Sequence, residues 1–186
     1  MTPLRPKSMV WVIATFAVAL LPQLPRMPAV LAVLTLFPLA WRIGAELRGW
    51  KPLPALLRHG LTAAALVTLF FSYGNLTGRR AAVSLLAVML ALKLVECYRI
   101  RDARLVVSFS LFLAATQFLF GQGIGMPFYG LACTLMALVT LVRLQRDDAW
   151  EPLGEPPRVK ATLASELGFS ARLLALAVPA GLAFFL

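Results

Sequence analysis

A short charged stretch, residues 93–102, contains the strongest candidates for functional side chains. Lys93 and Glu96 are three residues apart, so on a helix they share a face and can form an ion pair. Arg99 and Asp102 continue along approximately the same face if the helix persists, and Arg101 lies beside them. Charges within an apolar segment are costly and mark candidate functional sites. The stretch either docks another helix or a partner, or anchors two helices in register at the inner membrane face; we favour the anchor.

A second polar group lies in another apolar run. Thr116 and Gln117 fall within residues 111–120, and Gln122 follows. An amide in hydrocarbon needs a partner, and hydrogen bonds between membrane helices contribute about 0.6 kcal/mol on average. We therefore interpret these side chains as helix–helix contacts, because a substrate pathway would need more polar groups near the middle of the membrane.

The sequence offers little for metal binding or nucleophilic catalysis. It contains one histidine, His59, and two cysteines, Cys97 and Cys133, which do not form a Cys-x-x-Cys pattern. We interpret the cysteines as small buried thiols and His59 as an interfacial ring. The glycines of Gly121-Gln-Gly-Ile-Gly125 do not follow a strand, so they indicate a flexible turn rather than a dinucleotide-binding loop. We predict no catalytic residue, metal or cofactor in this chain.

Composition indicates that membrane helices must position these residues. The chain has 186 residues, of which 60% are hydrophobic and 14% charged, whereas soluble domains are about half apolar and a quarter charged. The apolar residues form long blocks without the alternation of barrel strands, and backbone groups in lipid must pair internally. We therefore predict an all-α, polytopic transmembrane helix bundle. The net charge of +10 does not indicate nucleic-acid binding, because the basic residues lie between apolar blocks.

Seven apolar blocks are candidate spans, each of which needs about 20 residues. The first two are short and are joined by a proline-rich link, which predicts a short helical hairpin; a re-entrant hairpin is the alternative. The last block is still apolar where the chain stops, so we expect a truncated final helix and a longer natural protein. The blocks are about 9–24, 27–41, 54–73, 81–97, 105–120, 127–144 and 172–186.

The distribution of positive charge predicts the orientation of the spans. With the N-terminus inside, Arg26, Arg79 and Arg80 lie outside and Lys93 lies within a span, which leaves the other 14 of the 18 Lys and Arg residues inside. This asymmetry predicts seven spans in an inner membrane, with the N-terminus cytoplasmic and the C-terminal end on the outer side. The predicted cytoplasmic loops are 42–54, 98–104 and 145–171.

Two segments have more than one interpretation. Residues 1–19 have a basic start, an apolar run and Ala17-Val-Ala19, which resembles a signal-peptidase site. The apolar run continues past that point, so we favour an uncleaved first helix. In the loop 145–171, the first half is rich in acidic residues and proline and predicts an irregular linker. From about Thr162 the pattern predicts a short interfacial helix that leads into the last span.

The two polar stretches also carry a resemblance to a known family. Leu92-Lys-Leu-Val-Glu96 followed by Arg101-Asp102, and then the run Phe112 to Gln122, resemble the N-terminal membrane domain of the bacterial TgpA-type transglutaminase-like proteins. The first span pair, the basic loop Trp41 to Trp50 and the final helix fit the same pattern. The resemblance therefore covers essentially the whole chain, residues 1–186, as a single transmembrane domain.

The resemblance implies where the chemistry of such a protein lies. In that family an extracytoplasmic transglutaminase-like domain with a Cys-His-Asp site follows the membrane domain, so we expect it C-terminal to residue 186. Neither Cys97 nor Cys133 belongs to the family's catalytic motif, and no catalytic residue is carried over. The resemblance thus implies a bacterial inner (cytoplasmic) membrane with the C-terminal end toward the periplasm, which agrees with the outward-facing C-terminal end that the charges predict.

Three hypotheses for function follow. The first is a membrane anchor that presents the transglutaminase-like domain of a cell-envelope protein, with the lipid bilayer and that domain as its partners. The second is an assembly module that binds other envelope proteins through its helices. The third is a small transporter or channel, which predicts a polar cavity at the middle of the membrane.

Overall fold

The computed structural model describes residues 5–49, 54–74, 78–121, 123, 125–150 and 163–185. All regular structure within these ranges is helical, which confirms the predicted all-α bundle. The elements are α1 (Pro6–Leu20), η1 (Leu24–Arg26), α2 (Ala29–Arg48), α3 (Ala55–Tyr73), α4 (Arg79–Val95), α5 (Ile100–Ala115), η2 (Thr116–Leu119), α6 (Gly125–Trp150) and α7 (Leu163–Phe185), where η denotes a 3₁₀-helix.

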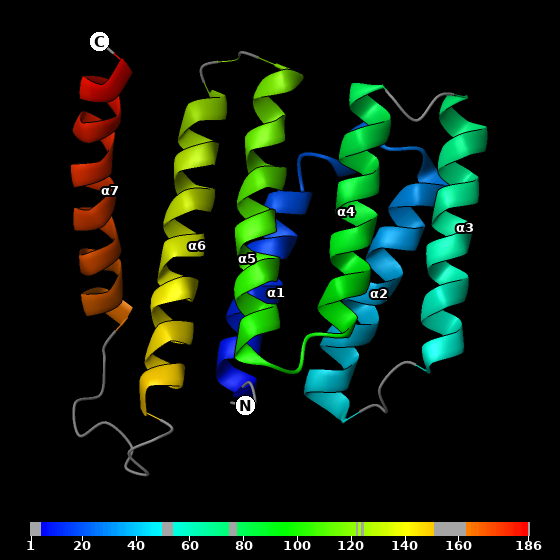
Figure 1. Ribbon diagram of the computed structural model, residues 1–186, viewed down its shortest axis with the longest axis horizontal. Coiled ribbons are helices and arrows are strands. Elements are labelled where there is room, and N and C mark those ends of the chain that lie inside the picture. Colours follow the sequence, from blue (N-terminus) through cyan, green and yellow to red (C-terminus); the bar gives the residue numbers. More distant parts are fainter. Residues whose placement is uncertain are drawn as a thin grey trace.

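Consecutive α-helices run in opposite directions (Figure 1). The bundle therefore has a proximal end, where α1 begins, and a distal end, where α7 finishes. Helices α3 and α7 lie at the two edges, and α1 lies behind α5. Seven helices that alternate in this way place the start of α1 and the finish of α7 on opposite sides.

Among the described residues, four segments are long and apolar enough to cross a membrane, and α1 is a shorter apolar helix. Large apolar side chains on the outside support this assignment: Leu56 is 86% exposed and Phe71 is 82% exposed. Apolar faces of this kind suit lipid as the surrounding solvent. The four segments are Ala29–Arg48, Leu56–Tyr73, Ile100–Leu119 and Gly125–Asp148.

The core of the bundle is built around the first helix. Helix α1 packs mainly against α5 and α6, and α2 packs mainly against α4, so the first two helices contact each other less than they contact later ones. Val12 and Phe16 of α1 and Leu31 of α2 are fully buried. The first two helices are therefore integrated into the bundle, and do not pack as a separate hairpin.

Several helices extend beyond the apolar blocks that predicted them. Helix α2 is 20 residues long and ends at Arg48, where Gly49 adopts a left-handed conformation with φ 66°. The predicted loops 42–54, 98–104 and 145–171 thus overlap α2, α5, α6 and α7. The length of an apolar block reflects the thickness of the hydrocarbon layer. The helix can extend beyond the block, because its backbone hydrogen bonds continue through Arg, Glu and Gln, which are good helix formers.

The polar segment before the last span is helical from Leu163. Residues 163–185 form one helix that continues through Pro179, so the segment predicted as an interfacial helix runs into the last span without a break. The predicted irregular linker is reduced by the extension of α6 to Trp150, and its remaining residues 151–162 lie outside the described ranges.

Candidate functional site

The charged stretch predicted from the sequence forms a cluster at the proximal end, but not on one helix. Helix α4 ends at Val95, Glu96 caps it, and α5 begins at Ile100, so the expected continuous helical face does not exist. The chain turns there because the amide of Glu96 donates to the carbonyl of Lys93 (3.1 Å), closing the last turn tightly.

The turn brings charges from three helices together. Lys93 Nζ lies 3.8 Å from Glu96 Oε2 and 3.9 Å from Asp102 Oδ1, and Arg58 Nη1 of α3 lies 3.0 Å from Glu96 Oε1. We call these four residues the proximal cluster. Their side chains are between 18% and 42% exposed, so each pair contributes about 1 kcal/mol or less. The geometry fits the predicted register anchor between helices.

Two predicted members lie outside this cluster. Arg99 and Arg101 are exposed at the start of α5, and neither forms an ion pair with the residues that the structure describes. Both lie at the start of α5, at the same end of the bundle as the cluster, after the turn between α4 and α5.

Arg42 links α2 to the same turn and was not singled out from the sequence. Its Nη2 donates to the carbonyl oxygen of Cys97 (3.0 Å), and its guanidinium lies 5.0 Å from the centre of the Tyr98 ring. Glu46, one turn later on α2, lies 3.8 Å from Arg42. The four-residue spacing of Arg42 and Glu46 is the sequence signal that indicates a paired, helical arginine.

A second charged group fastens α7 to α6 at the proximal end. Glu166 is buried, and its two carboxylate oxygens accept from Arg143 Nε (2.5 Å) and Arg146 Nη1 (3.2 Å). Arg143 also lies over the ring of Trp11, at 4.1 Å. We call Arg143, Arg146 and Glu166 the α7 clamp. The sequence placed Glu166 in an interfacial helix, and only the three-residue spacing of the arginines hints at its role.

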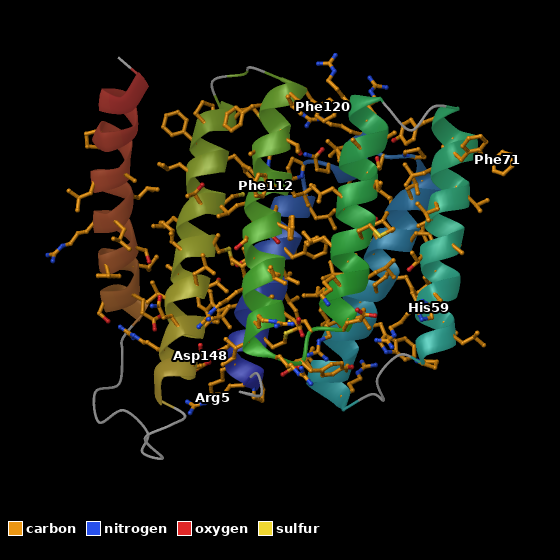
Figure 2. All side chains as sticks on the ribbon, viewed as in Figure 1. Arg5, His59, Phe71, Phe112, Phe120 and Asp148 are labelled. Carbon is orange, nitrogen blue, oxygen red and sulfur yellow. The ribbon has the colours of Figure 1, made fainter. Side chains whose placement is uncertain are left out.

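The remaining acidic residues of α6 are also paired. Asp147 accepts from the Ser8 hydroxyl and lies 3.6 Å from Arg5, and Asp148 lies 2.6 Å from Arg104. Figure 2 shows Arg5, His59 and Asp148 at the same end of the bundle, opposite Phe71 and Phe120. Asp147 and Asp148 thus belong to the helix bundle, not to a solvated linker.

Farther into the bundle, single hydrogen bonds join helices. Thr15 Oγ1 lies 2.9 Å from Thr140 Oγ1, and Gln23 Nε2 donates to Thr116 Oγ1 (3.0 Å). Thr116 therefore makes the predicted type of interhelical contact. Gln117 is fully buried, and neither polar atom of its amide has a partner among the described residues. Gln122 lies outside the described residues.

The arrangement can hold helices together through ion pairs and hydrogen bonds. Cys97 and Cys133 are buried free thiols, and His59 is exposed at the proximal end. Across the described ranges, no group of three or more His, Cys, Asp or Glu side chains could hold a metal ion. A nucleophile needs an adjacent base, whereas the charged and polar neighbours of the two thiols in those ranges are Arg42, Asp102 and Lys93 for Cys97, and Tyr129 for Cys133.

Comparisons with known proteins cover nearly the whole chain. A family model described as the TgpA N-terminal domain matches residues 11–186. The chain is also 31% identical over 140 residues to a protein-glutamine gamma-glutamyltransferase of Pseudomonas aeruginosa. That match covers 75% of this chain and 21% of the relative, so it spans about a fifth of the relative's length. No solved structure matches.

Proposed function

Because this chain belongs to the family of TgpA N-terminal domains, we propose that it anchors a transglutaminase-like protein in the inner membrane of a bacterium. In this proposal the chain itself is not catalytic. It presents a periplasmic Cys-His-Asp domain that follows residue 186. The similarity to a protein-glutamine gamma-glutamyltransferase, of which the match covers 21%, supports the transglutaminase-like assignment.

The alternation of the helices is the observation that carries this proposal. Helix α7 finishes at the distal end, opposite the start of α1 (Figure 1). Basic residues gather at the proximal end, and the positive-inside rule then assigns that end to the cytoplasm. A domain that follows α7 would emerge on the periplasmic side. The proximal arginines in ion pairs are Arg5, Arg42, Arg58, Arg104, Arg143 and Arg146.

Reporter fusions test the anchor proposal. Alkaline phosphatase, which is active only outside the cytoplasm, is fused after residue 186 and, as the matched control, after Gly49 at the proximal end. We expect activity from the first fusion only, with the reverse pattern for green fluorescent protein. Phosphatase activity from the Gly49 fusion alone would refute the proposed orientation.

The structure gives less support to the two other hypotheses. A transporter predicts a polar cavity at the middle of the membrane, whereas two of the cavities in the described ranges lie at the distal end of α4 and along an apolar groove between α2 and α3. An assembly module remains compatible with the anchor role, since the exposed face of α7 includes Leu176, which is 70% exposed. That face suits lipid equally well.

A further inference from the structure

A cavity of about 560 Å³ lies at the distal end of the bundle. It is lined by residues 78–81 at the start of α4, by Tyr73 of α3, and by Leu119 and Phe120 after α5. Figure 2 shows Phe120 at this end, away from the ion-paired Arg5 and Asp148. We propose that this cavity binds a phosphate-bearing anion, a role beyond anchoring.

Positive charge is concentrated around the cavity. Arg79 and Arg80 line it, and the Arg26 guanidinium lies 5.3 Å from the centre of the Phe120 ring, which forms part of its wall. No carboxylate lines the cavity among the residues that the structure describes. Within the described part of the chain, none of the three arginines forms an ion pair, in contrast to the arginines of the proximal cluster and the α7 clamp.

The placement of these arginines is unusual for a membrane protein. Arg26, Arg79 and Arg80 are the residues that the charge count assigns to the outer side, where Lys and Arg are depleted. Arg79 and Arg80 line one cavity, and Arg26 lies against Phe120, which forms part of the wall of that cavity. One buried atom also lacks a partner: Arg26 Nη1 makes no hydrogen bond to any residue that the structure describes.

The backbone adds a second attraction for an anion. Gly78 is the N-cap of the 17-residue helix α4, and Arg79 to Ala81 are its first turn. The helix has no side-chain cap and no acidic residue in its first turn. The free amides and the helix dipole at such an end favour a negative group, and residues 78–81 are the ones that line the cavity.

The chemistry of the lining selects phosphate among anions. A guanidinium presents paired donors that match phosphate oxygens, and two or three arginines suit a group with several oxygens. Tyr73, Leu119 and Phe120 add an apolar wall beside the charge. That combination suits the headgroup of an anionic phospholipid. The phosphate group is common to such a lipid and to a soluble phosphate.

Calorimetric titration of the purified chain in detergent tests the site. The probes are dihexanoylphosphatidylglycerol, zwitterionic dihexanoylphosphatidylcholine and inorganic phosphate. We expect saturable binding of phosphatidylglycerol that exceeds binding of phosphatidylcholine. Weaker binding of inorganic phosphate would identify a lipid as the source of the group, and equal binding would identify a soluble phosphate.

Variants assign the binding to the cavity. Arg80→Gln should weaken binding of phosphatidylglycerol about tenfold, and the triple variant with Arg26→Gln and Arg79→Gln should abolish it. Arg80 is exposed, so its replacement should leave the fold intact. Arg101→Gln, an exposed proximal arginine, is the control and should bind normally. Absence of saturable binding, equal binding of phosphatidylcholine, or unchanged binding in Arg80→Gln would overturn the proposal.

Discussion

Single ion pairs in the bundle differ in both burial and distance. Glu166 is 4% exposed and is bonded to two arginines, whereas the Lys93 side chain is 42% exposed and lies near two carboxylates at the limit of contact. Removing one partner of a buried pair leaves an uncompensated charge, while exposed pairs contribute little. The α7 clamp should therefore matter more for stability than the proximal cluster.

Substitution of Glu166 tests this ranking. Glu166→Gln should lower the free energy of unfolding by about 2 kcal/mol, because Arg143 and Arg146 lose their shared carboxylate. Lys93→Gln, the matched control, should cost less than about 1 kcal/mol. Unfolding in mixed micelles of increasing SDS content, followed by tryptophan fluorescence, measures both. Equal losses for the two variants would show that burial does not set the ranking.

The buried threonine pair permits a double-mutant cycle. Thr15→Val and Thr140→Val each remove one side of the 2.9 Å contact between α1 and α6. The coupling energy should be about 0.6 kcal/mol, the average for hydrogen bonds between membrane helices. The same unfolding assay gives all four values. A coupling of zero within error would mean that the hydroxyl groups do not interact in the membrane-embedded protein.

The two cysteines test the proposal that this chain is not catalytic. Cys97→Ala and Cys133→Ala remove buried thiols with no recorded histidine partner in the described ranges. In the full-length protein, both variants should retain transamidation activity after correction for the amount of folded protein. The activity is measured by incorporation of a labelled amine into a glutamine-containing protein. Loss of activity in a folded variant would place chemistry in this domain.

The sequence indicated several residues that form ion pairs, but not all of their partners. The pairing of Lys93 with Glu96 followed from their spacing, and Asp102 joined them through a turn rather than along a helix. Arg58 and Glu166 acquire their roles only when separate helices pack together. A single sequence gives no contact between positions so far apart, which is why those partners were missed.

At the scale of elements, apolar blocks located the helices well but not their ends. The predicted spans correspond to α1 to α7 in order, because a run of about 20 apolar residues is a strong signal. The ends depend on polar residues that continue a helix outside hydrocarbon and on the caps that end it. Gly49 is such a cap for α2. The central position of α1 was not predictable, since it arises from packing against α5 and α6.

That central position yields a prediction about processing. Cleavage after Ala19 would remove Val12 and Phe16, which are fully buried. We therefore expect the first helix to be retained, and the intact mass of protein isolated from membranes should include residues 1–19. Expression of a version that lacks them should give little folded protein. A mature mass that begins at Leu20 would refute this expectation.

For the whole molecule, the distribution of charge and the alternation of the helices both support the proposed orientation. The charge count used only the sequence, whereas the structure places the ion-paired arginines at the proximal end and the finish of α7 at the distal end. The fold class could be predicted because lipid permits few architectures. The distal cavity could not be predicted, since its wall combines residues 78–81 with Leu119 and Phe120, which are far apart in sequence and come together only when the helices pack.

Cysteine labelling tests whether the proximal and distal ends of the bundle lie on opposite sides of the membrane. Arg80→Cys at the distal end and Arg101→Cys at the proximal end are both exposed positions, and are placed separately in a background that carries Cys97→Ala and Cys133→Ala. In intact spheroplasts, a membrane-impermeant maleimide should label position 80 but not position 101, which should react only after permeabilisation. Labelling of both positions from the same side would contradict the account of an odd-numbered bundle that carries its C-terminal end across the membrane.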